Sequence, residues 1–129
     1  MKKHFNIIIA GAGGIAEAAG LILMEWSDVT PTLFIGDRNH LKAKKVATWI
    51  EAGTTKPCSV EPFLLAEEGL TQEMMAILRK GDIILDCLPG SQATRIAEFA
   101  KDFQLHYANL TEYIAETEKI KDLAKDVTT

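Results

Sequence analysis

The sequence has few of the residues that build metal centres and disulfide frameworks. It contains two cysteines, Cys58 and Cys87, and three scattered histidines, His4, His40 and His106. It has no Cys-x-x-Cys pair and no Cys/His cluster. Neither a zinc site nor a disulfide scaffold is therefore expected. We predict that both cysteines are buried small hydrophobes and that the protein holds no metal.

The sequence also lacks a long apolar run and a basic patch. The longest apolar run, residues 7–12, is far shorter than the ~20 residues that span a bilayer, and Glu17 interrupts the apolar stretch after it. The net charge is −4, and the few clustered lysines are balanced by acids elsewhere. This balance argues against a nonspecific nucleic-acid binder. We expect a cytoplasmic protein that binds neither nucleic acid nor membranes.

What the sequence does contain is a regular alternation of apolar segments. Its 129 residues, 47% hydrophobic and 25% charged, suit one domain, residues 1–129, with one core. The expected strands are residues 5–10, 31–36, 58–60, 82–88 and 105–108. The expected helices are residues 15–26, 40–52, 72–79, 92–100 and a last one from 111 onward. Residues 61–69 are expected to form a loop with some helical character.

Strict alternation of strands and helices predicts a three-layer α/β fold, a Rossmann-type doubly wound parallel sheet with helices on both faces. About five strands are expected. A dinucleotide-binding sheet has six, and here a helix with no following strand ends the sequence. We therefore expect the front part of a longer protein or a truncated form. An incomplete sheet edge invites association, so a homo-oligomer is also considered.

Helix faces and caps can be assigned from the same periodicity. The first helix is expected to bury one apolar face, formed by Ile15, Ala18, Ala19, Ile22, Leu23 and Trp26. Asn39, Thr71 and Ser91 are expected as N-caps, because their side chains can accept a hydrogen bond from the first helical turn. Gly53 and Gly81 are expected to end their helices.

The stretch Gly11-x-Gly13-x-x-Ala16 matches the dinucleotide-binding fingerprint G-x-G-x-x-G/A between a buried strand and an amphipathic helix. The first glycine permits the tight turn, the second lets a pyrophosphate approach the backbone, and Ala16 lets the helix pack closely. Free N–H groups and the helix dipole favour an anion there. The predicted cofactor-binding residues of this turn are Gly11, Ala12, Gly13, Gly14 and Ile15.

Asp37 and Arg38 follow the next predicted strand, near the position where the fingerprint places an acidic residue. A carboxylate there can accept hydrogen bonds from both hydroxyls of the adenosine ribose and would repel a 2′-phosphate. The guanidinium of Arg38 could instead pair with a 2′-phosphate or stack on the adenine. We predict NAD as the cofactor, with NADP as the alternative.

Two further strand ends lie at the edge of the sheet where ligands bind. Leu88 and Pro89 lie at the end of the fourth predicted strand and are predicted to line the path of the cofactor. Ser91 could contribute to that path, although a plain N-cap explains it better. Asn109 and Thr111 follow the fifth predicted strand and are read as caps rather than ligand contacts.

Taken together, these segments resemble the N-terminal NAD(P)-binding domain of the saccharopine dehydrogenase-like family. The matching segments are residues 8–16 (IIAGAGGIA), 37–39 (DRN), 82–90 (DIILDCLPG) and 106–112 (HYANLTE). The last one is similar to the family's hY-x-D-L-T/S stretch, except that Asn109 stands where the family usually has Asp. The resemblance implies an NAD(P)-dependent dehydrogenase or reductase that acts on an amino-acid-like C–N bond.

The same resemblance implies that the family's second domain, which builds the substrate site and carries the catalytic groups, is missing here. We therefore assign no catalytic residue, and a small-molecule substrate is expected only together with that domain. The alternative is a stand-alone NAD-sensing module, similar to the ligand-gating domains of potassium transport systems. A methyltransferase fits less well, because its glycine loop is usually spaced G-x-G-x-G.

Overall fold

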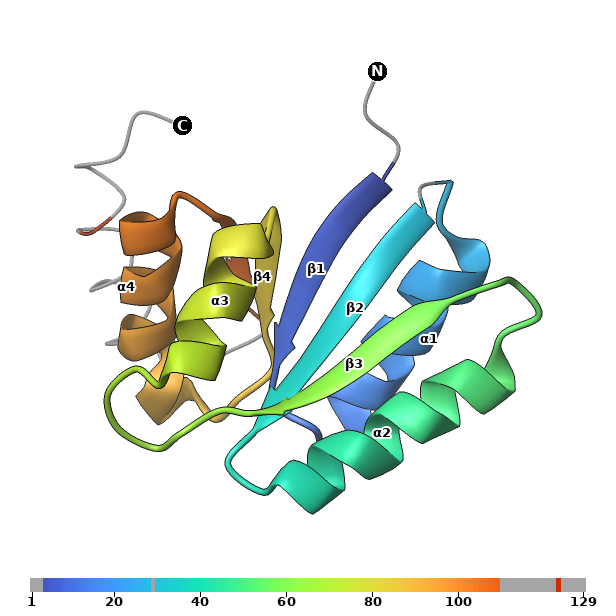
Figure 1. The fold of residues 1–129 in the computed structure, drawn as a ribbon, viewed down its shortest axis with the longest axis horizontal. Coiled ribbons are helices and arrows are strands. Elements are labelled where there is room, and N and C mark those ends of the chain that lie inside the picture. The colour runs from blue at the N-terminus through green and yellow to red at the C-terminus, as the bar shows by residue number, and fades with distance from the viewer. Residues whose placement is uncertain (1–3, 29, 110–122, 124–129) are drawn as a thin grey trace.

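The protein folds into one parallel sheet covered by helices on both faces (Figure 1). The computed structural model describes residues 4–28, 30–109 and 123. The strand order is β3-β2-β1-β4-β5, and all four neighbouring pairs are parallel. The strands are β1 (His4–Ala10), β2 (Thr30–Asp37), β3 (Ser59–Leu64), β4 (Ile83–Asp86) and β5 (His106–Asn109). This arrangement confirms the predicted Rossmann-type fold.

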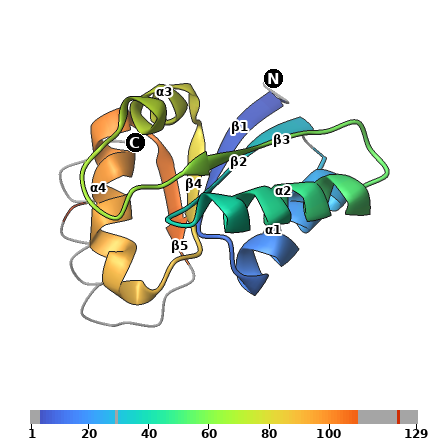
Figure 2. The same cartoon turned by 60° about the horizontal axis from the view of Figure 1, so that its bottom comes forward.

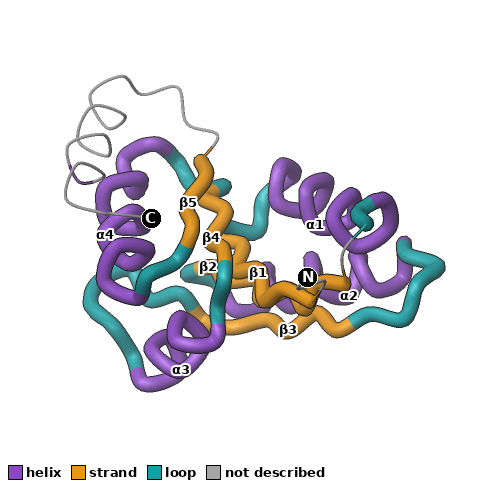
Figure 3. Tube along the Cα trace, turned by 90° about the horizontal axis from the view of Figure 1, so that it is seen from above, coloured by secondary structure: helices purple, strands orange, loops and turns teal. Residues whose placement is uncertain are grey.

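Helices lie between successive strands and form the outer two layers. They are α1 (Gly14–Trp26), α2 (His40–Gly53), α3 (Gln72–Lys80), the 3-10 turn η1 (Gly90–Gln92) and α4 (Ala93–Phe103). Seen from above, α1 and α2 cover one face of the sheet, whereas α3 and α4 cover the other (Figure 3). The predicted last helix from residue 111 lies outside the described residues except for Leu123, which is helical.

The central strand β1 contributes side chains to two separate cores. Ile7 and Ile9 pack under α1 and α2, whereas Ile8 and Ala10 pack under α3 and α4. Side chains alternate between the two faces of a strand, so a strand covered on both faces must be apolar at every position. The unbroken apolar run that predicted this strand therefore has its physical cause in the helices on both sides.

The third strand is longer than predicted. Residues 61–64, expected to form a loop, belong to β3, which pairs in parallel with β2. Pro62 interrupts the strand pattern because proline cannot donate to a sheet ladder. Since β3 is the edge strand of the described sheet, Pro62 is tolerated there. The expectation of a loop was therefore wrong for residues 61–64, whereas residues 65–69 do form a loop, without helical structure.

The buried face of α1 is also different from the predicted one. Ala16, Gly20 and Met24 face the core, while Ile15, Ile22 and Trp26, expected to be buried, are 55%, 57% and 77% exposed. The helix is apolar on nearly every side, so periodicity alone does not select a face. Small residues decide it instead, because a Cβ atom on Gly20 would overlap the side chain of Ile50 in α2.

The capping predictions are confirmed at two helices and wrong at a third. The side chains of Asn39 and Thr71 accept hydrogen bonds from the first turns of α2 and α3, and Gly81 ends α3. Gly53 ends α2 as predicted: it is the last residue of the helix, and Thr54 is the C-cap. Ser91 caps nothing, because it lies inside the turn η1, where the N–H of Gln92 bonds to Pro89.

The described part of the chain contains neither a helix suited to a membrane nor a cluster of metal ligands. None of the helices described is both long enough and apolar enough to cross a membrane. No group of three or more histidine, cysteine, aspartate or glutamate side chains lies close enough to hold a metal ion among residues 4–28, 30–109 and 123.

Candidate functional site

The carboxyl ends of β1, β2 and β4 meet at one edge of the sheet, shown toward the viewer in Figure 2. Strand order reverses between β1 and β4, because β2 and β3 continue to one side of β1 and β4 lies on the other. Ligands of open α/β sheets bind in the crevice at such a reversal. The loops after these strands are therefore the candidate site.

Gly11 makes the turn out of β1 and no other residue fits it. Its φ of +108° is a conformation that side chains rarely adopt, and a Cβ atom there would lie 3.0 Å from the carbonyl oxygen of Cys87. The N–H of Gly11 donates to the carbonyl oxygen of Gly36 at 2.6 Å. The turn is thus pressed against both neighbouring strands, as a tight strand-to-helix connection requires.

Gly13 and Gly14 differ from Gly11, because the fold itself does not need them. Gly13 has an extended backbone, with φ of −92° and ψ of −168°. A Cβ atom on either residue would meet nothing within 4 Å. Gly13 is the N-cap of α1, and no side chain there accepts a hydrogen bond from the first helical turn. Gly14 and Ile15 are the first two residues of the helix. This uncovered helix start fits the approach of an anionic group to the backbone.

Asp37 ends β2 and ties the glycine turn to the next loop. Its side chain is 8% exposed. One carboxylate oxygen accepts from the N–H of Ala12 at 3.1 Å, and the other accepts from the N–H of Asn39 at 2.9 Å. A carboxylate offers about four lone-pair directions, so both oxygens retain capacity for a further donor.

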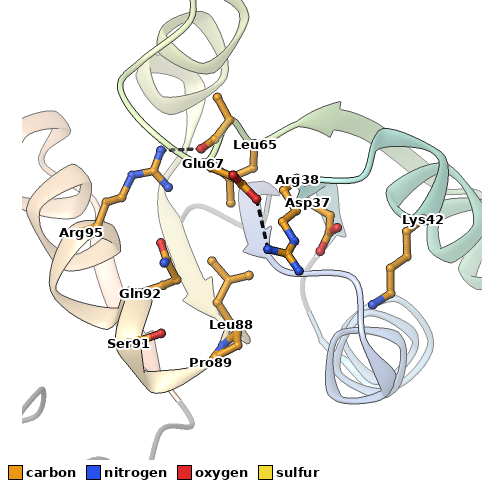
Figure 4. Close-up of a pocket in the computed structure, with 11 residues that line it drawn as sticks. Asp37, Arg38, Lys42, Leu65, Glu67, Leu88, Pro89, Ser91, Gln92 and Arg95 are labelled. Carbon is orange, nitrogen blue, oxygen red and sulfur yellow. Dashed lines mark hydrogen bonds and ion pairs between the residues drawn. The ribbon is translucent and has the colours of Figure 1, made fainter.

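A cavity of about 480 Å³ opens beside Asp37, between the loops after β2, β3 and β4 (Figure 4). Four of the predicted site residues line this cavity: Asp37, Arg38, Leu88 and Pro89. The cavity wall does not include the other predicted residues, which are Gly11, Ala12, Gly13, Gly14 and Ile15. The turn lies directly behind it, because a Cβ atom on Gly11 would come within 3.3 Å of the Leu88 side chain.

Three basic side chains line the cavity: Arg38, Lys42 and Arg95. Arg38 donates to a carboxylate oxygen of Glu67 at 3.1 Å. Arg95 reaches from α4 to the loop after β3 and donates to the carbonyl oxygens of Ala66 and Gly69. With two acids, Asp37 and Glu67, the cavity carries a small excess of positive charge, which suits a phosphorylated ligand.

The sequence did not predict several residues of the cavity wall, which are Lys42, Leu65, Ala66, Glu67, Ser91, Gln92 and Arg95. Glu67 was missed because residues 61–64 were expected to form a loop. Their strand, β3, ends shortly before Glu67, and this placed Glu67 at a strand end that the sequence did not reveal. Arg95 carried a signal of its own. A cation in the first turn of a helix opposes the helix dipole, and such a position calls for a specific partner.

Asp86 holds the Leu88–Pro89 loop in place. It is 2% exposed, accepts from the N–H of Leu88 at 3.0 Å and accepts from the hydroxyl of Tyr107 at 2.9 Å. Burial raises the pKa of Asp86, and these two hydrogen bonds act in the opposite direction. Asn109 donates to the same hydroxyl of Tyr107 at 3.1 Å, so its side chain serves this network.

The two cysteines are half-buried rather than fully buried, which corrects the prediction in degree. Both Cys58 and Cys87 are free thiols. Each sits at the margin of the core under α1 and α2, where the strand ends leave part of the side chain uncovered. Burial, helped by the neighbouring Asp86, raises the pKa of Cys87 to about 11. A thiol protonated at neutral pH is a poor nucleophile.

The fold and the site define the class: a Rossmann-type dinucleotide-binding domain. The chain belongs to the family described as the saccharopine dehydrogenase NADP binding domain, whose model matches residues 7–129. A nicotinamide dinucleotide is therefore its cofactor, and oxidoreductases are the proteins in which such a domain works. No curated protein sequence is similar enough to count as a match.

Solved structures with the same fold come from larger oxidoreductases. A 3-ketoreductase from Actinomadura kijaniata, in complex with TDP-benzene and NADP, is 19% identical with a TM-score of 0.63. Levoglucosan dehydrogenase in complex with NADH is 18% identical with a TM-score of 0.65. Each comparison covers 95% of this chain but only 35% and 32% of the other protein. The chain thus spans about a third of these proteins, and at this identity the likeness shows the fold alone.

Proposed function

We propose that the domain binds the dinucleotide across the crevice between β1 and β4, with the pyrophosphate at Gly13 and the adenosine end in the cavity beside Asp37. The observation that carries this placement is the open space at Gly13 and Gly14, where neither the backbone nor the packing requires a glycine. Glycine at such a position leaves room for a ligand against the backbone. Ala12 and Ile15 complete the turn around it.

The individual roles follow from this placement. Asp37 accepts hydrogen bonds from the ribose hydroxyls through the capacity that its two oxygens retain. Leu88 and Pro89 cover the cofactor from the β4 side. Arg38 lies next to the position where the phosphate of NADP would be attached. We infer a preference for NAD, because the buried carboxylate of Asp37 repels a 2′-phosphate and Arg38 is already paired with an acid.

For the whole protein we propose an oxidoreductase that acts on an amino-acid-like C–N bond. The family membership supports this reaction class. These 129 residues would supply cofactor binding, and the groups that bind and turn over the substrate would come from a second domain. The free thiols and the acidic balance support a cytoplasmic protein. A homo-oligomer through the sheet edge remains part of the proposal.

Calorimetric titration of the folded chain with NADH and with NADPH tests the placement. We expect saturable binding of both cofactors and a lower Kd for NADH. A lower Kd for NADPH would overturn the role given to Asp37 and transfer it to Arg38. If neither cofactor gives a heat of binding while circular dichroism verifies the fold, the proposed site is wrong.

A further inference from the structure

An ion pair at the cavity wall joins two different loops. Arg38 follows β2 and Glu67 lies in the loop between β3 and α3, and their side chains meet at 3.1 Å (Figure 4). Both are largely exposed, at 76% and 67% of the side-chain surface. Such exposed pairs contribute little to folding stability. The pair is therefore free to exchange its partners when a ligand arrives.

The loop that carries Glu67 is held by α4. The guanidinium of Arg95 donates to the carbonyl oxygens of Ala66 at 2.6 Å and Gly69 at 3.1 Å, one on each side of Glu67. Arg95 also lies over the ring of Phe99, 4.9 Å from its centre. The backbone around Glu67 is thus fixed at both flanks, and only its side chain needs to move to release Arg38.

We propose that Glu67 is a specificity-determining residue that competes with the 2′-phosphate of NADP for the guanidinium of Arg38. This inference rests on the proposed function, because it needs the adenosine ribose to lie beside Asp37. NADP differs from NAD only in this phosphate, whose charge near neutral pH is close to −2. To bind it, Arg38 must leave Glu67, and the phosphate must approach a carboxylate of the same sign.

The competition has a defined size. Breaking an exposed ion pair changes an equilibrium by up to about fivefold, and like-charge repulsion in a solvent-exposed cavity adds a further small factor. Removal of the Glu67 charge should therefore shift the ratio of NADPH to NADH affinity by about three- to tenfold toward NADPH. The affinity for NADH should change less than twofold, because NADH does not use Arg38 as a phosphate ligand.

The experiment is a calorimetric titration of the full chain and three variants with NADH and NADPH at one ionic strength. Glu67→Gln removes the competing charge and preserves the size of the side chain. Glu68→Gln is the matched control, because it makes the same charge change one position along the same exposed loop, outside the cavity wall. Glu67→Gln combined with Arg38→Ala tests whether the effect passes through Arg38.

We expect the shift toward NADPH in Glu67→Gln, little change in Glu68→Gln, and no shift when Arg38→Ala is also present. An unchanged affinity ratio in Glu67→Gln, with both cofactors still bound, overturns the inference and leaves the proposed function intact. An equal shift in Glu68→Gln overturns it as well, because the effect would then be general electrostatics. If the folded parent chain binds neither cofactor, it is the proposed function that fails.

Discussion

At the scale of single residues, the glycines of one short turn have different physical reasons. Gly11 is required by the fold, since its φ is positive and a Cβ atom would press on the carbonyl oxygen of Cys87. Gly13 is required by neither the backbone nor the packing. A substitution at Gly13 can therefore separate binding from folding, which a substitution at Gly11 cannot do.

We expect Gly13→Val to fold normally and to lose at least about tenfold in NADH affinity. The extended backbone at Gly13 suits valine, and the added side chain points into open space, where the proposed pyrophosphate lies. Calorimetry measures the Kd, and far-UV circular dichroism verifies the fold. Ala18→Val, on the exposed side of α1, is the matched control and should bind as the parent does. Unchanged affinity in Gly13→Val would refute the placement of the pyrophosphate at Gly13.

At the scale of secondary-structure elements, hydrogen bonds away from the site link Glu25 of α1 to the connection between α2 and β3. The carboxylate of Glu25 accepts from the hydroxyl of Thr54 at 2.6 Å, and from the N–H and the hydroxyl of Thr55 at 2.8 and 2.6 Å. The pKa of Glu25 is lowered to about 2, chiefly by the Thr54 hydroxyl, then by the two Thr55 donors and the charge of Lys56.

This lowered pKa predicts a specific acid sensitivity. A carboxylate whose pKa is lower in the folded state stabilises the fold above its unfolded pKa, near 4.5, and loses that contribution as the pH falls toward 2. We expect the free energy of unfolding, measured by urea titration, to fall between pH 4.5 and pH 2 more steeply in the parent than in Glu25→Gln. Glu98→Gln, an exposed site on α4, should retain the steep fall. Parallel curves for parent and Glu25→Gln would contradict the prediction.

The elements that the sequence predicted well are those that packing constrains on all sides. The run before Gly11 had to be a strand buried on both faces, and α2 and α4 each bury apolar residues at helical spacing. The errors occur where packing leaves freedom. Pro62 is acceptable only because β3 lies at an edge, and α1 is apolar nearly all round, so small residues rather than periodicity set its buried face.

The candidate site was predicted to the extent that it follows strand ends. We could name Asp37, Arg38, Leu88 and Pro89 because they lie at the ends of two apolar runs, and the structure brings them to one cavity. Glu67 could not, since its loop belongs to a strand that the sequence obscures. The cavity wall depends on strand order, and no local pattern encodes the order in which strands lie side by side.

At the scale of the whole molecule, the proposed cofactor joins two halves of the fold. The glycine turn and Asp37 belong to the half covered by α1 and α2, whereas Leu88 and Pro89 lead into α4 on the other face of the sheet. A ligand that touches both halves binds the native state and has no site on the unfolded chain. Binding must then stabilise both halves together.

We expect NADH at about 100 times its Kd to add roughly 2.7 kcal/mol, which raises the Tm of a domain of this size by about 10 °C. Fluorescence of Trp49 and Trp26 reports on α1 and α2, and far-UV circular dichroism reports on every element. Both transitions should move by the same amount, and at the same NADH concentration both should move by about half as much or less in Gly13→Val. A shift seen by fluorescence but absent from circular dichroism would place the cofactor on the α1 and α2 half alone, which would contradict a site shared across the crevice.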